Sequence, residues 1–386
     1  MLEVVTDYQE LLRLEEPWNE LIAELGETSP FESHAWTCAW WEAFGAANQL
    51  HVLVWRKNDK ICGVAPLMIS RERRIGLSVR RLGTLYNTHV QRTSFPVHEK
   101  LREEFLRRLW QHVVSIASTW DVVELSPFHR ASPVLALVEN SSAHSGHSCT
   151  YWTEGQSPFL AITGSWDEYL KTLSKNRRSN FTRQFKKLSE QGAVTLELVT
   201  GGDKLEGALQ EGCRIEAMGW KGGEGTAINS NPVLAAFYSS LAARSAATDG
   251  VRLYFLCMDG RRISFQYCLE TNNKLYLLKS GYDTDFAPYS PSQLLLWKVL
   301  ESAYTRGVRE YDLLGGADDW KLVWAQKTRE VVWLIIYSKT LRGRLLWLLK
   351  LKVVATVRAA RQRLRRHRSD DNLDGNGRRG EGNART

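Results

Sequence analysis

The sequence predicts an α/β protein built of two tandem lobes, each with a mixed, twisted sheet flanked by helices. Three observations support this prediction: a chain of 386 residues, hydrophobic residues at 43% with aromatic residues at 10%, and an internal repeat of expected elements. The length exceeds what one ordinary core holds and suits two domains with extensions. The apolar content is enough to fill two such cores.

The first third of the chain predicts the order helix, hairpin, helix, strand. The expected elements are helices at 17–25 and 35–44, strands at 51–56, 61–70 and 81–85, a helix at 99–118 and a strand at 121–125. Lys57-Asn58-Asp59-Lys60 is the expected hairpin turn. A stretch rich in Ser, His, Gly and Asn at 139–149 has the composition of a domain boundary.

A second copy of this order is expected after the boundary. The expected elements are helices at 166–173, 174–191, 202–220 and 232–246, strands at 194–199, 251–258, 262–270 and 274–280, a helix at 292–306 and a strand at 310–314. Asp259-Gly260 is a strong hairpin signal. The hairpin that it turns matches the one at 51–70, which predicts two lobes of one architecture packed side by side. Two unrelated α/β domains with common hairpins are the alternative.

The positive charge of the chain lies in its carboxyl-terminal end. The formal net charge is +8, but residues 339–386 carry fourteen Lys and Arg against four Asp and Glu, which leaves about −2 for residues 1–338. The folded body is therefore not basic, whereas the end of the chain is. We divide the chain into lobes at 1–150 and 151–338, a basic amphipathic helix at 339–368 and a disordered tail at 369–386.

Cysteine spacing and hydropathy predict a cytoplasmic protein. The six cysteines show no CxxC or Cys/His ligand spacing, so we expect free thiols in a reducing compartment and no metal site. Residues 1–20 contain acids and lack the continuous apolar run that a signal peptide requires. The longest apolar stretches, 331–337 and 345–357, are too short or too interrupted for a transmembrane helix.

The most informative stretch for chemistry is 276–316, which predicts a strand, a polar loop and a helix. Ser290 is the expected N-cap and Pro291 the first helical residue, because a serine oxygen accepts an orphan N–H and proline has none to leave unpaired. The remaining N–H groups of the first turn would form a site for a pyrophosphate. An ordinarily capped helix with nothing bound is the alternative.

Several stretches of the run 166–324, and more loosely one near the amino terminus, carry a resemblance to a known family. They are LSKNRRSNFTRQFKKLSEQG (173–192), GWKGGEGTAI (219–228), ISFQYCLE (263–270), LLKSGYD (277–283), YSPSQLLLWKVLE (289–301), YDLLGGADDWKLVWA (311–325) and, more loosely, PFESHAWTCAWWEAF (30–44). With these stretches the run resembles the acetyltransferase-like family of bacterial cellulose and exopolysaccharide synthesis, which is similar to the Fem peptidoglycan-bridge aminoacyltransferases with their paired GNAT lobes. Relatives usually carry glycine where Ser292 stands. The resemblance implies acetyl-CoA or another acyl-CoA as donor, whereas Fem enzymes use aminoacyl-tRNA.

Acyl transfer to an amine or hydroxyl needs a deprotonated nucleophile, a polarised carbonyl and close positioning. No Ser or Cys lies in a recognisable nucleophile elbow or beside a natural base, so we expect direct attack. Asp283, just after the strand end, is the first candidate for the base, and Glu216, before the glycine-rich segment, is the second. A loop-capping aspartate and a solvated glutamate on a helix are the alternatives.

Three further side chains are candidates for binding or orienting the substrates. Gln266 would orient a substrate, unless it is satisfied in the core or faces solvent. Lys279 would contact a phosphate or polarise a carbonyl, unless it snorkels to solvent. Lys321 resembles the lysine of an aromatic–lysine pair in Fem-like enzymes. In those enzymes this lysine contacts an anionic ligand. The residues expected at the coenzyme are Lys279, Ser280, Ser290, Pro291, Ser292 and Gln293.

Three surface features are candidate binding elements. The helix at 174–191 carries six basic residues that would dock a phosphorylated or lipid-linked substrate, although charge runs are often solvated faces. The glycine-rich segment 219–228 is a candidate mobile loop or a plain connection. Trp220 and Trp320 are candidate platforms for a sugar, with a place in the core as the alternative.

The carboxyl-terminal helix combines an apolar stripe with a basic flank. The stripe consists of Leu346, Leu349, Val353, Val357, Ala360 and Leu364. This pattern is typical of a helix lying in an anionic membrane interface, which would place the protein at the inner face of the membrane. Packing on the protein's own body is the second possibility, and nucleic acid, bound without sequence specificity, is the third.

We therefore expect an acyl-CoA-dependent N- or O-acyltransferase that acts on a small-molecule or saccharide acceptor in envelope or exopolysaccharide assembly. An aminoacyl-tRNA-dependent ligase is the second hypothesis, although the sequence lacks a long heptad pattern for the coiled-coil arm that Fem enzymes often carry. A catalytically silent, membrane-apposed scaffold of a polysaccharide synthase is the third. The acyl group, the acceptor and the oligomeric state stay open.

Overall fold

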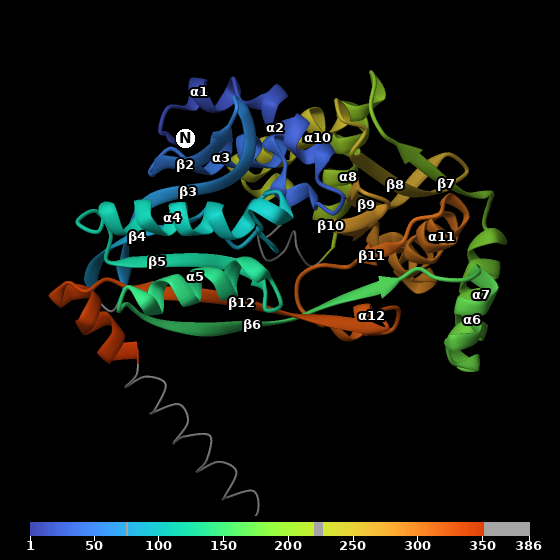
Figure 1. Cartoon of the computed structure of the whole chain (residues 1–386). Coiled ribbons are helices and arrows are strands. Elements are labelled where there is room, and N and C mark those ends of the chain that lie inside the picture. The colour runs from blue at the N-terminus through green and yellow to red at the C-terminus, as the bar shows by residue number, and fades with distance from the viewer. Residues whose placement is uncertain (75, 220–226, 351–386) are drawn as a thin grey trace, which may run out of the picture.

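The structure, a computed structural model, describes residues 1–74, 76–219 and 227–350, which form two lobes around one continuous sheet (Figure 1). The sheet has 12 strands in the order β1-β2-β3-β4-β5-β12-β6-β11-β10-β9-β8-β7. The predicted fold class is confirmed, with one addition: the sheets of the two lobes are hydrogen-bonded to each other. The segments of the predicted helix and tail beyond residue 350 lie outside the described residues.

The amino-terminal lobe contains β1 to β5 and five α-helices. Its elements are β1 (Leu2–Val5), α1 (Tyr8–Leu12), α2 (Glu15–Glu24), η1 (Pro30–Glu32), α3 (His34–Phe44), β2 (Gln49–Lys57), β3 (Lys60–Arg74), β4 (Leu77–Thr84), η2 (Glu99–Leu101), α4 (Arg102–Ser115), β5 (Val122–His129) and α5 (Pro133–His144). Strands β2, β3 and β4 form an antiparallel meander, and β4 pairs in parallel with β5 after the crossover through α4.

The carboxyl-terminal lobe repeats this plan with longer helices. Its elements are β6 (Ser148–Ala161), α6 (Trp166–Thr172), α7 (Lys175–Ser189), β7 (Val194–Val199), α8 (Lys204–Ala217), η3 (Ile228–Ser230), α10 (Pro232–Ala246), β8 (Val251–Met258), β9 (Arg261–Thr271), β10 (Lys274–Tyr282), η4 (Thr284–Tyr289), α11 (Pro291–Arg306), β11 (Glu310–Asp312), α12 (Asp319–Leu322) and β12 (Lys327–Tyr337). Strands β8, β9 and β10 are antiparallel, and β10 pairs in parallel with β11 after α11. The repeat predicted from the two hairpins is therefore confirmed.

Strands β6 and β12 join the lobes. Along its length β12 pairs with β6, and between Val331 and Tyr337 it also pairs with β5 of the amino-terminal lobe. The other edge of β6 pairs with β11. The stretch 139–149, predicted to be a linker, instead forms the end of α5 and the start of β6. Its polar composition belongs to a half-exposed helix end and strand, which sequence composition does not distinguish from a loop.

The two lobes also share a hydrophobic core. Helix α3 packs against α10, and Trp36 meets Phe237 edge to face with ring centroids 5.4 Å apart. Phe31 meets Tyr276 of β10 in the same way at 5.7 Å. Burial of large aromatic side chains from both lobes favours a fixed arrangement of the two halves. Within residues 1–74, 76–219 and 227–350, no helix has the length and hydropathy that crossing a bilayer requires.

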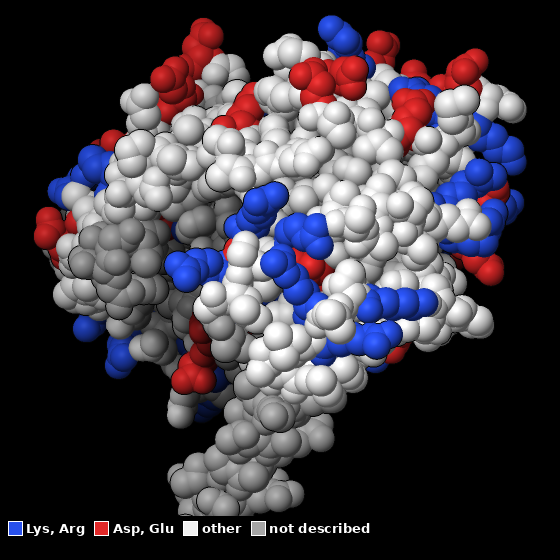
Figure 2. All heavy atoms as spheres, turned by 90° about the vertical axis from the view of Figure 1, so that its left-hand side faces the viewer, with Lys and Arg blue, Asp and Glu red and all other residues white. Residues whose placement is uncertain are grey.

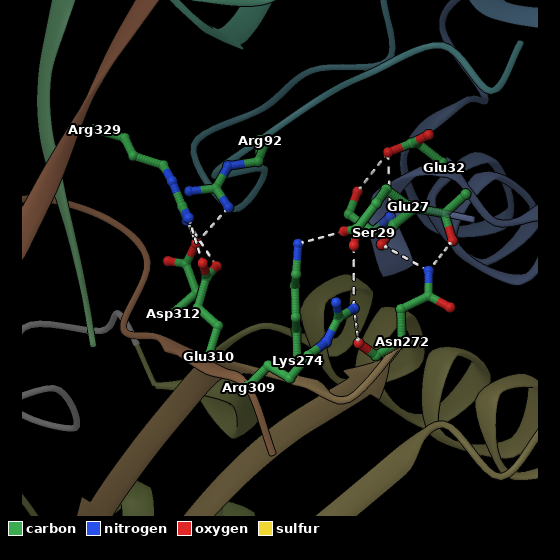
Figure 3. Close-up of polar contacts among 11 residues, drawn as sticks. Glu27, Ser29, Glu32, Arg92, Asn272, Lys274, Arg309, Glu310, Asp312 and Arg329 are labelled. Carbon is green, nitrogen blue, oxygen red and sulfur yellow. Dashed lines mark hydrogen bonds and ion pairs between the residues drawn. The ribbon is translucent and has the colours of Figure 1, made fainter. Parts of the chain in front are cut away.

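Ion pairs, some buried and one exposed, complete the contact between the lobes (Figure 3). Arg92 of the amino-terminal lobe pairs with Asp312 at the end of β11, and Arg329 of β12 pairs with both Asp312 and Glu310. At a second place Glu27 contacts Lys274 at 2.6 Å. Because buried charges are tolerated only when they are paired, these contacts constrain how β11 lies against the amino-terminal lobe.

Candidate active site

A cavity opens where β10 and β11 part. The two strands pair only from Lys274 to Tyr276 on β10, and β10 then bulges between Leu277 and Lys279. The space beyond is a cavity of about 630 Å³, lined by the second half of β10, the loop after β11, the beginning of α11, Glu216 of α8, Tyr238 of α10, and Thr88, His89 and Gln91 of the amino-terminal lobe. Its volume lies in the range of small-molecule sites.

Helix α11 begins at the wall of this cavity. Pro291 is its first residue, and the carbonyl of Ser290 accepts hydrogen bonds from the N–H groups of Gln293 at 3.0 Å and Leu294 at 3.1 Å. Within the described part of the chain, the N–H of Ser292 has no backbone acceptor. Since Ser292 lines the cavity, the positive end of the helix and one orphan N–H meet there, as an anion-binding site requires.

The cap of α11 differs in detail from the one expected. Ser290 occupies the N-cap position, but its backbone is left-handed, with φ 53° and ψ 51°, and its hydroxyl makes no capping hydrogen bond. The carbonyl of Ser290, rather than its side chain, accepts the N–H groups of the first turn. The expected side-chain cap was therefore wrong. The side-chain amide of Gln293 is also occupied, because its oxygen accepts a hydrogen bond of 2.8 Å from the indole N–H of Trp324.

A lysine and a glutamate face each other inside the cavity. Lys279 at the bulge of β10 places Nζ 3.7 Å from Oε1 of Glu216, and Oε2 of Glu216 accepts the N–H of Ile228 at 2.9 Å. The side chain of Glu216 is completely buried, and that of Lys279 is 13% exposed. Neither side chain therefore extends freely into solvent. Gly281 permits this approach, since a Cβ there would lie 2.4 Å from Cα of Glu216.

His89 completes the cavity from the amino-terminal lobe. It lies between Thr88 and Val90, half-buried, and its ring stacks on Phe44 at a centroid distance of 6.4 Å. Burial, assisted by the ammonium of Lys279 and opposed by Glu216, lowers the pKa of His89 below its usual value of 6.5. A neutral imidazole at neutral pH can accept a proton. His89 was not predicted, because no local pattern around Asn87-Thr88-His89 indicates a site.

Lys321 holds the loop that follows β11. Its ammonium donates to the carbonyls of Leu314 at 2.9 Å and Gly316 at 3.1 Å and contacts the carboxylate of Asp318 at 3.1 Å. The loop needs such support because Leu314 has a φ of 50°, a conformation that costs free energy for a branched residue. The N–H of Leu314 is fixed in turn by Oδ1 of Asp312 at 2.9 Å.

Two predicted residues lie outside the cavity lining. Asp283 is buried, forms an ion pair with Arg261 and accepts the N–H of Asp285 at 3.1 Å, so it opens η4 as an Asx-turn. Gln266 is buried in the core, where it accepts a hydrogen bond of 2.9 Å from the hydroxyl of Tyr311. The structure therefore does not bring these two side chains to the other candidates.

The remaining predicted residues come together around one cavity. They are Glu216, Lys279, Ser280, Ser290, Pro291, Ser292, Gln293 and Lys321. Trp320 joins them, and its ring lies 5.4 Å from the ammonium of Lys321. Trp220 and most of the glycine-rich segment, 220–226, lie outside the described residues. In the described part of the chain, no group of three or more His, Cys, Asp or Glu has the arrangement of a metal site.

Comparison with known proteins places this site in a recognised class of domain. Residues 175–322 match the model of the Acetyltransferase (GNAT) domain family. The match contains every residue of the carboxyl-terminal lobe that lines the cavity. The carboxyl-terminal lobe is therefore a GNAT domain, and the protein has a GNAT-type acyltransferase fold. A search of curated proteins gave no match.

Solved structures extend this likeness to both lobes. FemX is 12% identical, with 90% of this chain and 99% of that chain covered and a TM-score of 0.61. The carboxyl-terminal domain of a proposed lysylphosphatidylglycerol synthetase from Agrobacterium fabrum is 11% identical, with coverage of 89% and 96% and a TM-score of 0.53. A conserved protein of unknown function from Bacteroides thetaiotaomicron is 9% identical, with coverage of 87% and 100% and a TM-score of 0.50. The chain thus has the two-lobed fold of FemX.

Proposed function

We propose that the protein transfers an acyl group from an acyl-CoA to an amine or hydroxyl acceptor. The observation that carries this proposal is the cavity between β10 and β11, which ends at the amino terminus of α11. The pyrophosphate of the coenzyme binds at the N–H of Ser292 and the positive end of the helix. Ser292 supplies the same backbone N–H as a glycine, so the serine leaves this interaction intact.

Transfer proceeds in this proposal by direct attack of the acceptor on the thioester. The lone pair of the acceptor nitrogen or oxygen forms a bond to the carbonyl carbon, the C–S bond breaks, and coenzyme thiolate leaves. His89 accepts the proton that the acceptor loses and returns it to the thiolate. Lys279, whose Nζ lies 3.7 Å from Oε1 of Glu216, stabilises the negative charge that develops on the carbonyl oxygen.

The acceptor binds in this proposal on the side formed by the amino-terminal lobe. The cavity is lined by Thr88, His89 and Gln91 of this lobe and by Trp320, so polar groups and one aromatic ring border the same space. An aromatic face beside polar groups suits a sugar or another acceptor with both apolar and polar surfaces. A saccharide of the cell envelope or of an exopolysaccharide is the acceptor that the sequence resemblance favours.

Isothermal titration of the full chain with acetyl-CoA tests the proposal. Ser292→Glu places a carboxylate in the first turn of α11, where an acid suits the helix dipole but repels a pyrophosphate. We expect wild-type binding, a loss of at least about tenfold in Ser292→Glu, and no change in Thr305→Glu at the other end of the helix. Absence of binding by the wild-type protein, or equal affinities of the wild type and Ser292→Glu, would overturn the proposal.

A second candidate is transfer from aminoacyl-tRNA, and helix α7 is the observation that favours it. The helix carries Lys175, Arg177, Arg178, Arg183, Lys186 and Lys187. Within the described part of the chain, none of the six has a carboxylate within 4 Å, although Arg177 donates to the carbonyl of Val323 at 3.3 Å. Such a strip attracts a phosphate backbone. Salt-dependent binding of charged tRNA without binding of acetyl-CoA would select this candidate. Absence of transfer from either donor would instead leave the scaffold hypothesis.

A further inference from the structure

At one end of the molecule, the β3–β4 hairpin lies beside the beginning of the carboxyl-terminal helix. Residues 341–350 are helical, and Thr340 caps them: its carbonyl accepts the N–H of Arg344 at 3.0 Å and its hydroxyl that of Gly343 at 3.2 Å. A recess of about 320 Å³ lies between helix and hairpin, lined by Arg71, Ser78, Arg80, Asp121, Thr340 and Arg342. The two segments therefore form one surface.

The inner face of this helix is fixed on the sheet. Leu346 is only 8% exposed, and with Trp347 it packs in a cluster that contains Val79 of β4 and Tyr337 of β12. The rings of Tyr337 and Trp347 lie 5.4 Å apart. Packing on the protein's own body, expected as the second possibility for the apolar stripe, thus occurs at Leu346.

The outer face of the same helix carries a separate row of exposed leucines. Leu341, Leu345 and Leu348 are 85%, 45% and 54% exposed, and their spacing places them on one side of a helix. Leu77 at the tip of the β3–β4 hairpin is 40% exposed. Exposed leucines at this spacing, on a helix whose other side is already packed, mark a contact surface rather than a core.

Near these leucines lie four arginines that form no ion pair with the described carboxylates. In the described part of the chain, Arg71, Arg73, Arg342 and Arg344 have no carboxylate within 4 Å. Figure 2 shows Lys and Arg side chains gathered on this face, above the start of the carboxyl-terminal segment. Exposed leucines and uncompensated positive charge therefore occupy the same end of the molecule.

The acidic groups on this surface are already neutralised. Asp121 in the recess accepts from the backbone N–H, Nε and Nη2 of Arg80 at 2.9, 3.2 and 2.8 Å. Glu124 and Glu72 both contact Arg74, at 2.7 and 2.8 Å. The net charge presented to a partner is therefore positive, and an anion approaching Arg71 and Arg342 meets no free carboxylate of these three residues.

We propose that this surface docks the protein on a bilayer that contains anionic lipids. The leucines enter the acyl boundary while Arg71, Arg73, Arg342 and Arg344 contact lipid phosphates. A nucleic acid would bind the arginines but leave the leucine row uncovered. A bilayer satisfies both features at once, and each basic residue near an anionic surface strengthens binding by about fivefold.

Vesicle flotation with the full chain tests this proposal. We expect binding to phosphatidylcholine vesicles that contain phosphatidylserine, and little binding to phosphatidylcholine alone. Arg71→Gln/Arg342→Gln should weaken binding by about 25-fold. Leu341→Gln/Leu345→Gln/Leu348→Gln should also weaken it, without loss of folding because the three side chains are exposed. Circular dichroism and titration with acetyl-CoA check that the variants are folded.

A matched control removes two positive charges elsewhere. Lys57 and Arg107 both act on Glu104, and Lys57 is the last residue of β2, where it pairs with Lys60 at the end of β3 opposite the hairpin tip. Lys57→Gln/Arg107→Gln should therefore leave flotation unchanged. The proposal is overturned by absence of vesicle binding, or by binding that the control weakens as much as the arginine variant. It is also overturned if the leucine variant binds like the wild type, because the surface would then be a general anion site that inorganic phosphate or nucleic acid occupies.

Discussion

The ion pair between Arg92 and Asp312 gives the sharpest prediction about how the lobes are joined. Arg92 is nearly buried and Asp312 completely so, and Nη1 of Arg92 lies 2.5 Å from Oδ2 of Asp312. Asp312→Asn keeps the shape and the acceptor for the N–H of Leu314 but leaves Arg92 without its carboxylate. Removal of one partner of a buried pair costs about 3–5 kcal/mol. We expect Asp312→Asn and Arg92→Met each to lower the free energy of unfolding by about 3 kcal/mol.

The double variant and the pH dependence make this prediction specific. When both charges are removed, no buried charge is left alone, so Arg92→Met/Asp312→Asn should lose less than the sum of the single variants. Burial raises the pKa of Asp312, but Arg92, the N–H of Leu314 and Arg329 outweigh it and hold that pKa below the usual value. A carboxyl whose pKa is lower in the folded state stabilises above its unfolded pKa of about 3.9 and loses that contribution as the pH falls.

Denaturant unfolding of the wild type, the two single variants and the double variant, at pH values from neutral to acidic, measures both effects. The gap between wild type and Asp312→Asn should shrink as the pH drops below about 4. Additive losses in the double variant, or a gap that grows toward acid pH, would refute the reasoning that this pair acts as a buried unit.

Three further predictions concern the cavity. Gly281→Val forces a Cβ against Cα of Glu216, so it should destabilise the protein by about 1–3 kcal/mol in denaturant unfolding and abolish binding of acetyl-CoA. His89→Gln should lower the rate of transfer by about 10²–10⁴-fold and leave the free energy of unfolding unchanged. In the wild type the rate should increase with pH in the range below pH 6.5, as His89 loses its proton, and this increase should be absent in His89→Gln. Lys321→Met leaves the carbonyls of Leu314 and Gly316 without their donor, so it should cost about 1–3 kcal/mol and raise KM more than it lowers kcat.

The sequence predicted the fold well where local signals act. Asp259-Gly260 fixed the β8–β9 hairpin, and the helix at 232–246 has the predicted bounds because its proline start and apolar spacing are local properties. Strands β6 and β12 were not predicted as strands. These strands pair with segments far away in the sequence: Tyr337 of β12, for example, pairs with Val122 of β5 and Ser148 of β6. A local sequence pattern does not indicate which strands become neighbours in the sheet.

The candidate site was likewise predicted where local signals act and missed where distant segments meet. The strand–loop–helix around Ser290 and Pro291 was found because proline at the first helical position follows a local rule, although the expected side-chain cap of Ser290 was wrong. His89 was missed because only the packing of the lobes brings it to the cavity. Asp283 shows the opposite error: a carboxylate after a strand end looked available, but Arg261 and the turn into η4 already use it. Residue type and position in the sequence do not show whether a carboxylate already forms an ion pair or accepts a hydrogen bond within the fold.

A duplicated fold offers two positions for a donor site, one in each lobe. The parallel strands β4 and β5 of the amino-terminal lobe indicate that one donor site is present per chain. Strands β4 and β5 pair over three residues, as β10 and β11 do, but the space beyond is closed: the hydroxyl of Thr84 donates to the carbonyl of Ser126 at 2.5 Å and accepts its N–H at 3.1 Å. The chain after β4 then crosses to the other lobe, where His89 lines the open cavity. We therefore expect calorimetry to give one acetyl-CoA per chain, and Ser292→Glu to weaken that single site by at least about tenfold without revealing a second site. A stoichiometry of two, or a residual site of undiminished affinity in that variant, would mean that the amino-terminal lobe opens to a donor of its own.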